Sequence, residues 1–204
     1  MSPRRRDEIE LEIALLNPNR YSEASARRLR PWLERVLREL LRERPPAAPA
    51  PVLPWAGGAG NASSLGVRFA GDRAMRRANR DFRGKDQTTD VLSFPGDGTH
   101  LGDILVSVPQ ARRQAAAAGR DPAREIRVLL LHGVLHCLGH DHEVDGGEME
   151  RLERRLRRRW IGAPASRPRL RPATGVAIGD NRSRDRPSPV AALVAGRRTV
   201  RRAR

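Results

Sequence analysis

The chain has 204 residues and a formal net charge of +16, because 40 lysines and arginines outnumber 24 aspartates and glutamates. At this length we expect one domain of ordinary size with extensions. No apolar run approaches the roughly 18 residues that would span a bilayer, and the N-terminal arginines are not followed by the apolar core of a signal peptide. The single cysteine, Cys137, cannot form an internal disulfide. These features predict a cytoplasmic protein in a reducing compartment.

The positive charge is concentrated at the C-terminal end. Residues 163–204 contain eleven arginines against Asp180 and Asp185, a net charge of +9, which leaves +7 on residues 1–162. This end is rich in proline, alanine, glycine and serine and has no aromatic residue. It cannot bury enough apolar surface to offset the entropy lost on ordering. We therefore expect residues 1–162 to form the domain and 163–204 to be a disordered tail, either merely solubilising or a nonspecific anion-binding arm.

The apolar patterning predicts the following elements in chain order. A strand is expected over residues 9–16 and a helix from Pro31 to Leu41, followed by a Pro- and Gly-rich loop at 45–60. Further strands are expected at 65–69, 89–94 and 101–108. Further helices are expected at 71–82, 109–118, 122–138 and from Asp145 onward. This order favours an α/β (α+β-like) single domain with a small mixed sheet of about four strands packed with helices. The helix at 122–138 is apolar almost all round, so it is expected at the centre.

Four of the five histidines lie within eleven residues: His132, His136, His140 and His142. His132 and His136 are four residues apart, so both project from one face of the buried helix. Burying two imidazoles is costly unless their nitrogens find partners. A third histidine close by therefore favours a metal site over two separately hydrogen-bonded side chains.

The distance that a continuous helix would place between the histidines decides which of them is the third metal ligand. If the helix continued, His140 would lie roughly 12 Å along the axis from His132, whereas zinc holds nitrogen ligands at about 2.0–2.1 Å. The helix must therefore break, and Gly139 is suited to the left-handed conformation that ends helices. The returning chain then brings His142 to His132 and His136. Three imidazoles with an open fourth position are typical of a catalytic zinc site.

The other polar residues near this motif have two interpretations each. His140 is expected at the surface or in contact with a ligand, and His100 as an isolated loop histidine. Asp141 either orients a ligand imidazole or stabilises a turn. The histidine spacing is that of metzincin proteases, but those enzymes carry a glutamate directly after the first histidine, where this chain has Gly133. This difference weakens a protease interpretation.

A second motif, at residues 79–95, contains Arg83 and Lys85, the only lysine of the chain. Arg83 can hold a phosphate with two parallel hydrogen bonds, and Lys85 can add a point charge. Either residue can equally be a solvated surface charge. A loop that enters a sheet beside a metal-binding helix is a common place for substrate contacts.

The segments 79–95, 101–104 and 132–142 together resemble the YbeY family of zinc-dependent bacterial endoribonucleases, over residues 7–160. The resemblance implies a compact α/β domain that binds one Zn²⁺ through His132, His136 and His142. It also implies that Arg83 is important for cleavage of single-stranded RNA, that the 3′ end of 16S ribosomal RNA and the small ribosomal subunit are the targets, and that the protein acts in ribosome quality control. Two positions depart from the family pattern: His140 replaces a usual aromatic residue, and Thr88 a usual proline.

Our leading hypothesis from the sequence is zinc-assisted hydrolysis of a phosphodiester in RNA. Zinc lowers the pKa of water from about 15.7 to roughly 7, and Arg83 would stabilise the developing charge. Asp141 is a candidate proton acceptor, and attack by the ribose 2′-hydroxyl is an alternative route. Two other functions stay open at this point: a zinc metallopeptidase, and a non-catalytic, zinc-stabilised ribosome assembly factor.

Overall fold

The computed structural model describes residues 11–17, 20–43, 64–96, 100–142 and 145–162, together with the backbone of 177–178. The predicted loop at 45–60, the start of the first predicted strand and nearly all of the predicted tail at 163–204 lie outside the described residues. None of the helices in the described ranges is long and apolar enough to cross a membrane.

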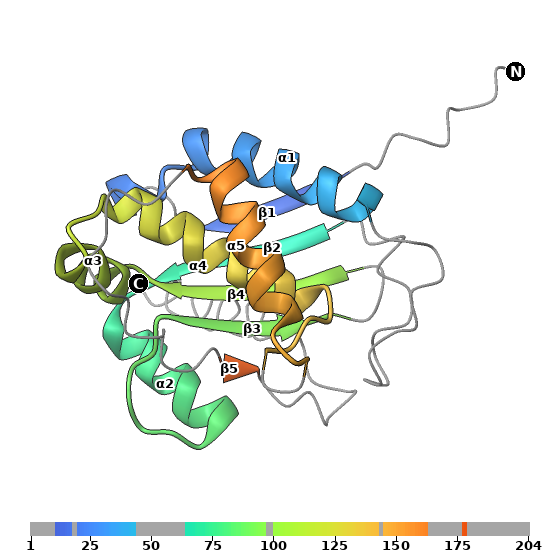
Figure 1. Ribbon diagram of the computed structural model, residues 1–204. Helices are drawn as coiled ribbons and strands as arrows, with labels where there is room; N and C mark the ends of the chain where they lie inside the picture. Colours follow the sequence, from blue (N-terminus) through green and yellow to red (C-terminus); the bar gives the residue numbers. More distant parts are fainter. Residues whose placement is uncertain are drawn as a thin grey trace, which may run out of the picture.

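A mixed sheet forms the middle of the domain (Figure 1). Its strands lie in the order β1-β2-β4-β3-β5, where β1–β2, β2–β4 and β3–β5 are parallel pairs and β3–β4 is antiparallel. This arrangement confirms the predicted fold class, with β5 as a two-residue addition inside the segment predicted as a tail. This strand is defined only by its backbone pairing with β3. Two residues are too few to show an alternating pattern of side chains, so the sequence does not predict it. The strands are Glu12–Leu16 (β1), Ser64–Ala70 (β2), Val91–Pro95 (β3), His100–Ser107 (β4) and Ala177–Ile178 (β5).

The helices cover both faces of the sheet. A short 3₁₀ turn and five α-helices are present in the described ranges: Ser22–Ala24 (η2), Ala26–Glu43 (α1), Asp72–Arg83 (α2), Val108–Ala117 (α3), Pro122–Cys137 (α4) and Glu148–Trp160 (α5). Side chains of α1, α4 and α5 pack in one core with Val91, Ile104 and Val106 of the sheet. Side chains of α2 pack in a second core with Leu92, Phe94 and Leu105. Because neighbouring strand residues point to opposite faces, the two cores are separated by the sheet.

The prediction that Pro31 opens the first helix is wrong, because α1 begins at Ala26 and contains the proline. Proline inside a helix forfeits one backbone hydrogen bond. The earlier start adds Leu29, which is fully buried, to the apolar stripe that continues through Leu33 and Leu37. We infer that burial of Leu29 outweighs the missing bond.

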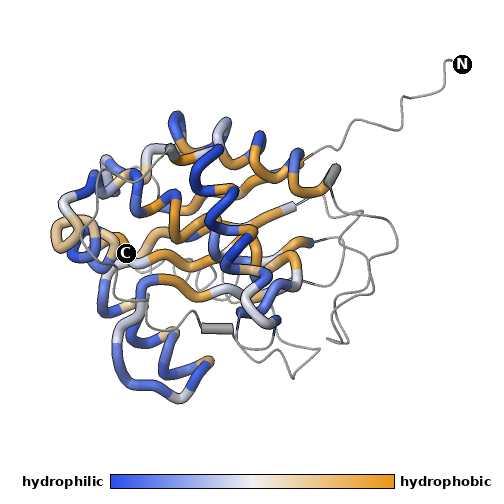
Figure 2. Tube along the Cα trace, viewed as in Figure 1, coloured by the Kyte–Doolittle hydropathy of each residue, from blue (hydrophilic) through white to orange (hydrophobic). Residues whose placement is uncertain are grey.

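Helix α4 is the central helix that the sequence predicts. Figure 2 shows it mainly in the hydrophobic colours of the strands, whereas the exposed sides of α2 and α5 are hydrophilic. It packs against α3, α5, β3 and β4. At its start, the Asp121 carboxylate accepts a hydrogen bond from the Ala123 N–H at 3.1 Å. Burial on all sides fixes this helix, and with it the histidines that it carries.

Candidate metal centre

The end of α4 brings the three predicted histidines together. Gly139 has a φ of +91°, the left-handed conformation expected of it. Its N–H bonds to the His136 carbonyl at 2.9 Å, and the next N–H, of His140, reaches back to the Leu135 carbonyl at 3.0 Å. These bonds close the helix and reverse the chain. His142 thereby lies beside the two histidines of the helix.

The spacing of the imidazoles fits a single metal ion. One nitrogen from each of His132, His136 and His142 lies within 4.8 Å of the other two. The Nε2 atoms of His132 and His136 are 3.2 Å apart. Two ligands of a tetrahedral zinc at about 2.0–2.1 Å are separated by about 3.3 Å, so this pair needs little adjustment. His142 is exposed, so one side of the cluster is open to solvent.

The surroundings of His136 favour a neutral imidazole, which is the form that binds metals. His136 is 1% exposed. Burial, and to a smaller extent the proximity of His132 and His142, lowers the pKa of His136 to about 3. A hydrogen bond with the backbone of His140 opposes this shift. His136 is therefore neutral at physiological pH and needs no deprotonation to bind a cation.

Glu153 of α5 is a member of this site that the sequence analysis missed. Its Oε1 atom lies 3.1 Å from Nδ1 of His132, and the Arg157 guanidinium donates to the same oxygen at 2.6 Å. Burial raises the pKa of Glu153, but the hydrogen bond with His132 and the charge of Arg157 outweigh it, so the net shift is downward. An ionised Glu153 holds the proton of His132 on Nδ1 and leaves Nε2 free for a metal. The available signal was an acid on the apolar stripe of α5 formed by Met149, Leu152 and Leu156.

The remaining polar residues near the motif take different places. His140 is not part of the three-histidine cluster in the described structure, and its N–H closes the helix end. The carbonyl of Asp141 accepts a hydrogen bond from the Asp145 N–H at 3.1 Å, which stabilises the turn after the cluster. The prediction that His100 is an isolated loop histidine is wrong: it begins β4, with Nδ1 2.9 Å from Ser64 Oγ and Nε2 3.4 Å from Asp103. Strand pairing, which brings Ser64 opposite His100, accounts for the difference.

Gly133 lies where α4 packs tightly against β3 and β4 of the sheet. A Cβ atom at this position would be 2.9 Å from Ile104 Cγ2 and 3.0 Å from Ser93 Oγ. The position that carries the general base in metzincins therefore faces the sheet, with no room for a glutamate.

Arg83 and Lys85 lie in a second feature, a polar pocket of about 440 Å³. Gly84 ends α2 in the left-handed conformation, and the Lys85 N–H bonds back to the Asn79 carbonyl at 3.4 Å, which turns the chain into the loop before β3. The neighbouring acid Asp86 is held by Arg76 at 2.6 Å. Within the described ranges no carboxylate pairs with the side chain of Arg83 or Lys85. Both charges are therefore available to an anion.

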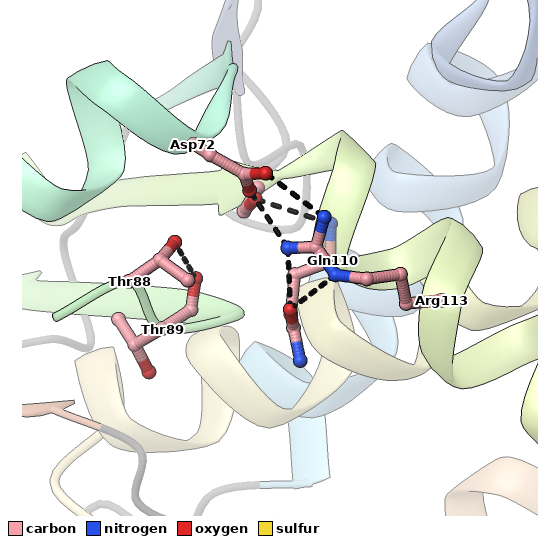
Figure 3. A network of polar contacts seen from close by, with 6 residues as sticks. Asp72, Thr88, Thr89, Gln110 and Arg113 are labelled. Carbon is pink, nitrogen blue, oxygen red and sulfur yellow. Dashed lines mark hydrogen bonds and ion pairs between the residues drawn. The ribbon is translucent and has the colours of Figure 1, made fainter.

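The pocket and the histidine cluster are separate features of the surface. The described lining of the pocket contains Arg83 and Lys85 but none of the three histidines. Gln110, which lines the pocket, also bonds to a polar network outside it, in which Asp72, at the start of α2, accepts two hydrogen bonds from Arg113 of α3 at 2.8 Å (Figure 3). The structure thus groups the sequence-predicted residues into two sites, one for a metal and one for an anion.

A mixed α/β domain with an open three-histidine centre on a buried helix is the class of protein that these features define. The model of the family described as Endoribonuclease YbeY matches residues 15–160, and the chain belongs to this family. The Endoribonuclease YbeY of Solibacter usitatus is 45% identical over 144 residues, which cover 71% of this chain and 87% of the relative. That of Chloroflexus aurantiacus (strain ATCC 29366 / DSM 635 / J-10-fl) is 45% identical over 103 residues, 45% of this chain and 67% of the relative. The solution structure of TM1509 from Thermotoga maritima matches with a TM-score of 0.49 at 24% identity, covering 74% of this chain and 89% of that one.

Proposed function

We propose that this protein is a zinc-dependent endoribonuclease that cleaves single-stranded RNA during ribosomal RNA maturation in the cytoplasm. The observation that carries the proposal is the cluster of His132, His136 and His142 within 4.8 Å, open to solvent through His142. Similarity to proteins named Endoribonuclease YbeY supports the choice of RNA as substrate. Precursor 16S ribosomal RNA, cut at its 3′ end, and the small ribosomal subunit are the partners that we propose, with a role in ribosome quality control.

The three histidines would hold the metal. When bound, zinc supplies a Lewis acid that activates water and polarises a phosphoryl oxygen. His136 contributes a neutral imidazole without loss of a proton, because its pKa is about 3. Glu153 keeps His132 in the tautomer whose Nε2 faces the other ligands. Neutral ligands leave the full charge of the cation available for the chemistry.

The RNA backbone would be held by the pocket that contains Arg83 and Lys85. Arg83 and Lys85 have no carboxylate partner within the described ranges, so each can pair with a phosphate. We assign Arg83 a catalytic part as well, stabilising the charge that develops on the phosphoryl oxygens. Asp141, directly before His142, is the candidate proton acceptor.

The structure gives a reason to prefer a nuclease over a metallopeptidase. In the peptidases with this histidine spacing, the residue after the first histidine is the general base. Here that residue is Gly133, and a Cβ atom added to it would lie within 3.0 Å of Ile104 and Ser93. The peptide-cleaving base is therefore missing and cannot be restored by a single substitution.

The proposal is tested with precursor ribosomal RNA and four proteins: wild type, His142→Ala, Arg83→Ala and Arg77→Ala, with zinc content measured on each. Arg77 is an exposed arginine of α2 outside the pocket, so it is a matched control. We expect His142→Ala to lose zinc and cleavage together and Arg83→Ala to keep zinc but lose cleavage. Full cleavage by His142→Ala without metal would overturn the mechanism. Binding to small subunits that survives both substitutions, with no cleavage by wild type, would identify an assembly factor.

A further inference from the structure

A positively charged side chain lies beside the candidate metal centre, although like charges repel. Arg157 of α5 donates from Nη2 to Oε1 of Glu153 at 2.6 Å, and the same oxygen lies 3.1 Å from Nδ1 of His132. A single carboxylate oxygen therefore separates the guanidinium from a candidate metal ligand. The charge of Arg157 by itself opposes the binding of a metal ion. Any favourable contribution of this residue to the centre must come through Glu153.

The ion pair between Arg157 and Glu153 is largely shielded from water. The Glu153 side chain is 9% exposed and that of Arg157 is 31% exposed. A second pair on the same helix, Arg154 with Glu150, has side chains that are 59% and 71% exposed. Water competes for both partners of such an exposed pair, so it restrains neither side chain strongly. The shielded pair restrains its carboxylate, because a charged hydrogen bond is strong where water is excluded.

The backbone that carries Arg157 is held by two other helices. Three residues further on, the Trp160 carbonyl accepts a hydrogen bond from Nε1 of Trp32 in α1 at 3.0 Å. Arg124 of α4 donates to the next carbonyl, of Ile161, at 2.7 Å. Both carbonyls belong to the end of α5, where a helix leaves such groups without partners of its own. These bonds tie the last turn of α5 to its neighbours and so fix the position from which the Arg157 side chain extends.

The spacing within α5 lets Arg157 orient Glu153 independently of α4. The two residues are four positions apart, so their side chains are neighbours on one face of the helix. A glutamate side chain has several rotatable bonds and loses conformational freedom when it is held in one place. The ion pair restricts Glu153 within its own helix. The contact of Glu153 with His132 then requires less further ordering.

We propose that Arg157 is a positioning residue of the metal centre, an inference that rests on the proposed function. It holds the Glu153 carboxylate against Nδ1 of His132. Through this contact it keeps Nε2 of His132 directed at the metal position, 3.2 Å from Nε2 of His136. Arg157 acts only through Glu153 and provides no ligand atom.

The test measures the zinc affinity of the full chain by competition with a chromophoric chelator, which requires no RNA cleavage. Arg157→Met keeps an apolar stem and removes the guanidinium. We expect zinc affinity to fall about tenfold, the low end of the roughly 10- to 100-fold loss for groups that support metal ligands. A purely electrostatic effect has the opposite sign, because removing a cation favours a bound cation. Arg154→Met removes the same charge from an exposed pair of the same helix and should not lower zinc affinity.

Two further variants show whether Arg157 acts through Glu153. Arg157→Lys restores a cation four residues from the carboxylate and should recover part of the lost affinity. The double variant Glu153→Gln/Arg157→Met should bind zinc no more weakly than Glu153→Gln alone, because the charge that Arg157 holds is already absent. Losses that add in the double variant would show that Arg157 acts independently of Glu153 and would overturn the proposal.

A readout without metal separates this inference from the proposed function. Nitrogen NMR of the metal-free protein reports which ring nitrogen of His132 carries the proton. Wild type should carry it on Nδ1, and Arg157→Met should show both tautomers. A wild-type proton on Nε2 would overturn the positioning role even if Arg157→Met does not fold, as would zinc affinity in Arg157→Met that equals or exceeds that of wild type. If the two proteins differ as expected but wild type cleaves no RNA, the positioning role stands and the proposed function fails.

Discussion

The Glu153 carboxylate lies 3.1 Å from Nδ1 of His132, and this contact joins α5 to the candidate metal centre on α4. The two residues are 21 positions apart in the chain. The same carboxylate oxygen accepts a hydrogen bond from Arg157, so its position does not depend on the imidazole alone. A histidine fixed in this way presents Nε2 to a metal without losing rotational freedom on binding. The contact therefore makes α5 part of the metal centre.

Replacing Glu153 should weaken metal binding. Glu153→Gln keeps the shape of the side chain but removes the charge that favours a proton on His132 Nδ1. We expect zinc affinity to fall by about 10- to 100-fold, measured by competition with a chromophoric chelator. Glu150→Gln is the matched control, because Glu150 lies on the same helix, is exposed and pairs only with Arg154 among the contacts that the structure records. Unchanged zinc affinity in Glu153→Gln would show that the contact does not position His132.

Adding a methyl group at Gly133 should destabilise the domain. In Gly133→Ala the new Cβ would lie 2.9 Å from Ile104 Cγ2, so α4 or the sheet must shift. We expect a loss of about 1–3 kcal/mol in the free energy of unfolding, measured by urea denaturation of the metal-free protein. Gly71→Ala is the control, because its added methyl meets only the Tyr21 hydroxyl, at 3.5 Å. If Gly133→Ala is as stable as Gly71→Ala, α4 does not pack against the sheet as tightly as the 2.9 Å distance to Ile104 indicates.

The ion pair between Asp72 and Arg113 should make stability depend on acid pH. The hydrogen bond from Arg113 lowers the pKa of Asp72 below its ordinary value, against a smaller opposing effect of burial. The unfolded chain then binds a proton more readily, so this contribution is present above the ordinary pKa and is lost as the pH falls through the folded pKa. Because both side chains are about half exposed, we expect only about 0.2–1 kcal/mol at neutral pH.

Comparing the urea denaturation of wild type and Asp72→Asn at neutral and acid pH measures this contribution. The difference between the two proteins should shrink below about pH 4. Asp81→Asn removes the same charge near the other end of α2, where an acid is unfavourable to the helix, so it should be neutral or stabilising. If the difference in unfolding free energy between wild type and Asp72→Asn is the same at neutral and acid pH, the ionised Asp72 carboxylate is not the source of the stability.

Cys137 should be unreactive in the folded protein. The side chain is 5% exposed, and burial raises the pKa of its thiol, so the reactive thiolate is scarce. We expect Ellman's reagent to modify the thiol at the rate of global unfolding, and rapidly in denaturant. Fast modification under native conditions would show that the end of α4 opens locally, and the metal centre with it.

Much of the metal centre follows from residues close together in the chain. The spacing of His132 and His136 places both on one helix face, and Gly139 provides the reversal that brings His142 to them. These are local properties of helix geometry and glycine conformation, so they are visible before any tertiary contact is known. The order of strands and helices is local in the same sense, and it correctly predicts a mixed α/β fold. The start of α1 is not set locally, because burial of Leu29 outweighs the signal of Pro31, which by itself predicts a later start.

Contacts between distant elements depend on packing. Glu153 reaches His132 only because α5 lies against α4, and the amides of Asn79 and Gln114 share a pocket only because α2 and α3 meet beside β3. His100 finds Ser64 only through the pairing of β2 with β4. In each case the partner is set by which surfaces bury one another, a property of the whole chain that no local pattern encodes. Short-range geometry therefore identifies the metal ligands, while tertiary packing supplies Glu153, which orients one of them, and the pocket that contains Arg83 and Lys85.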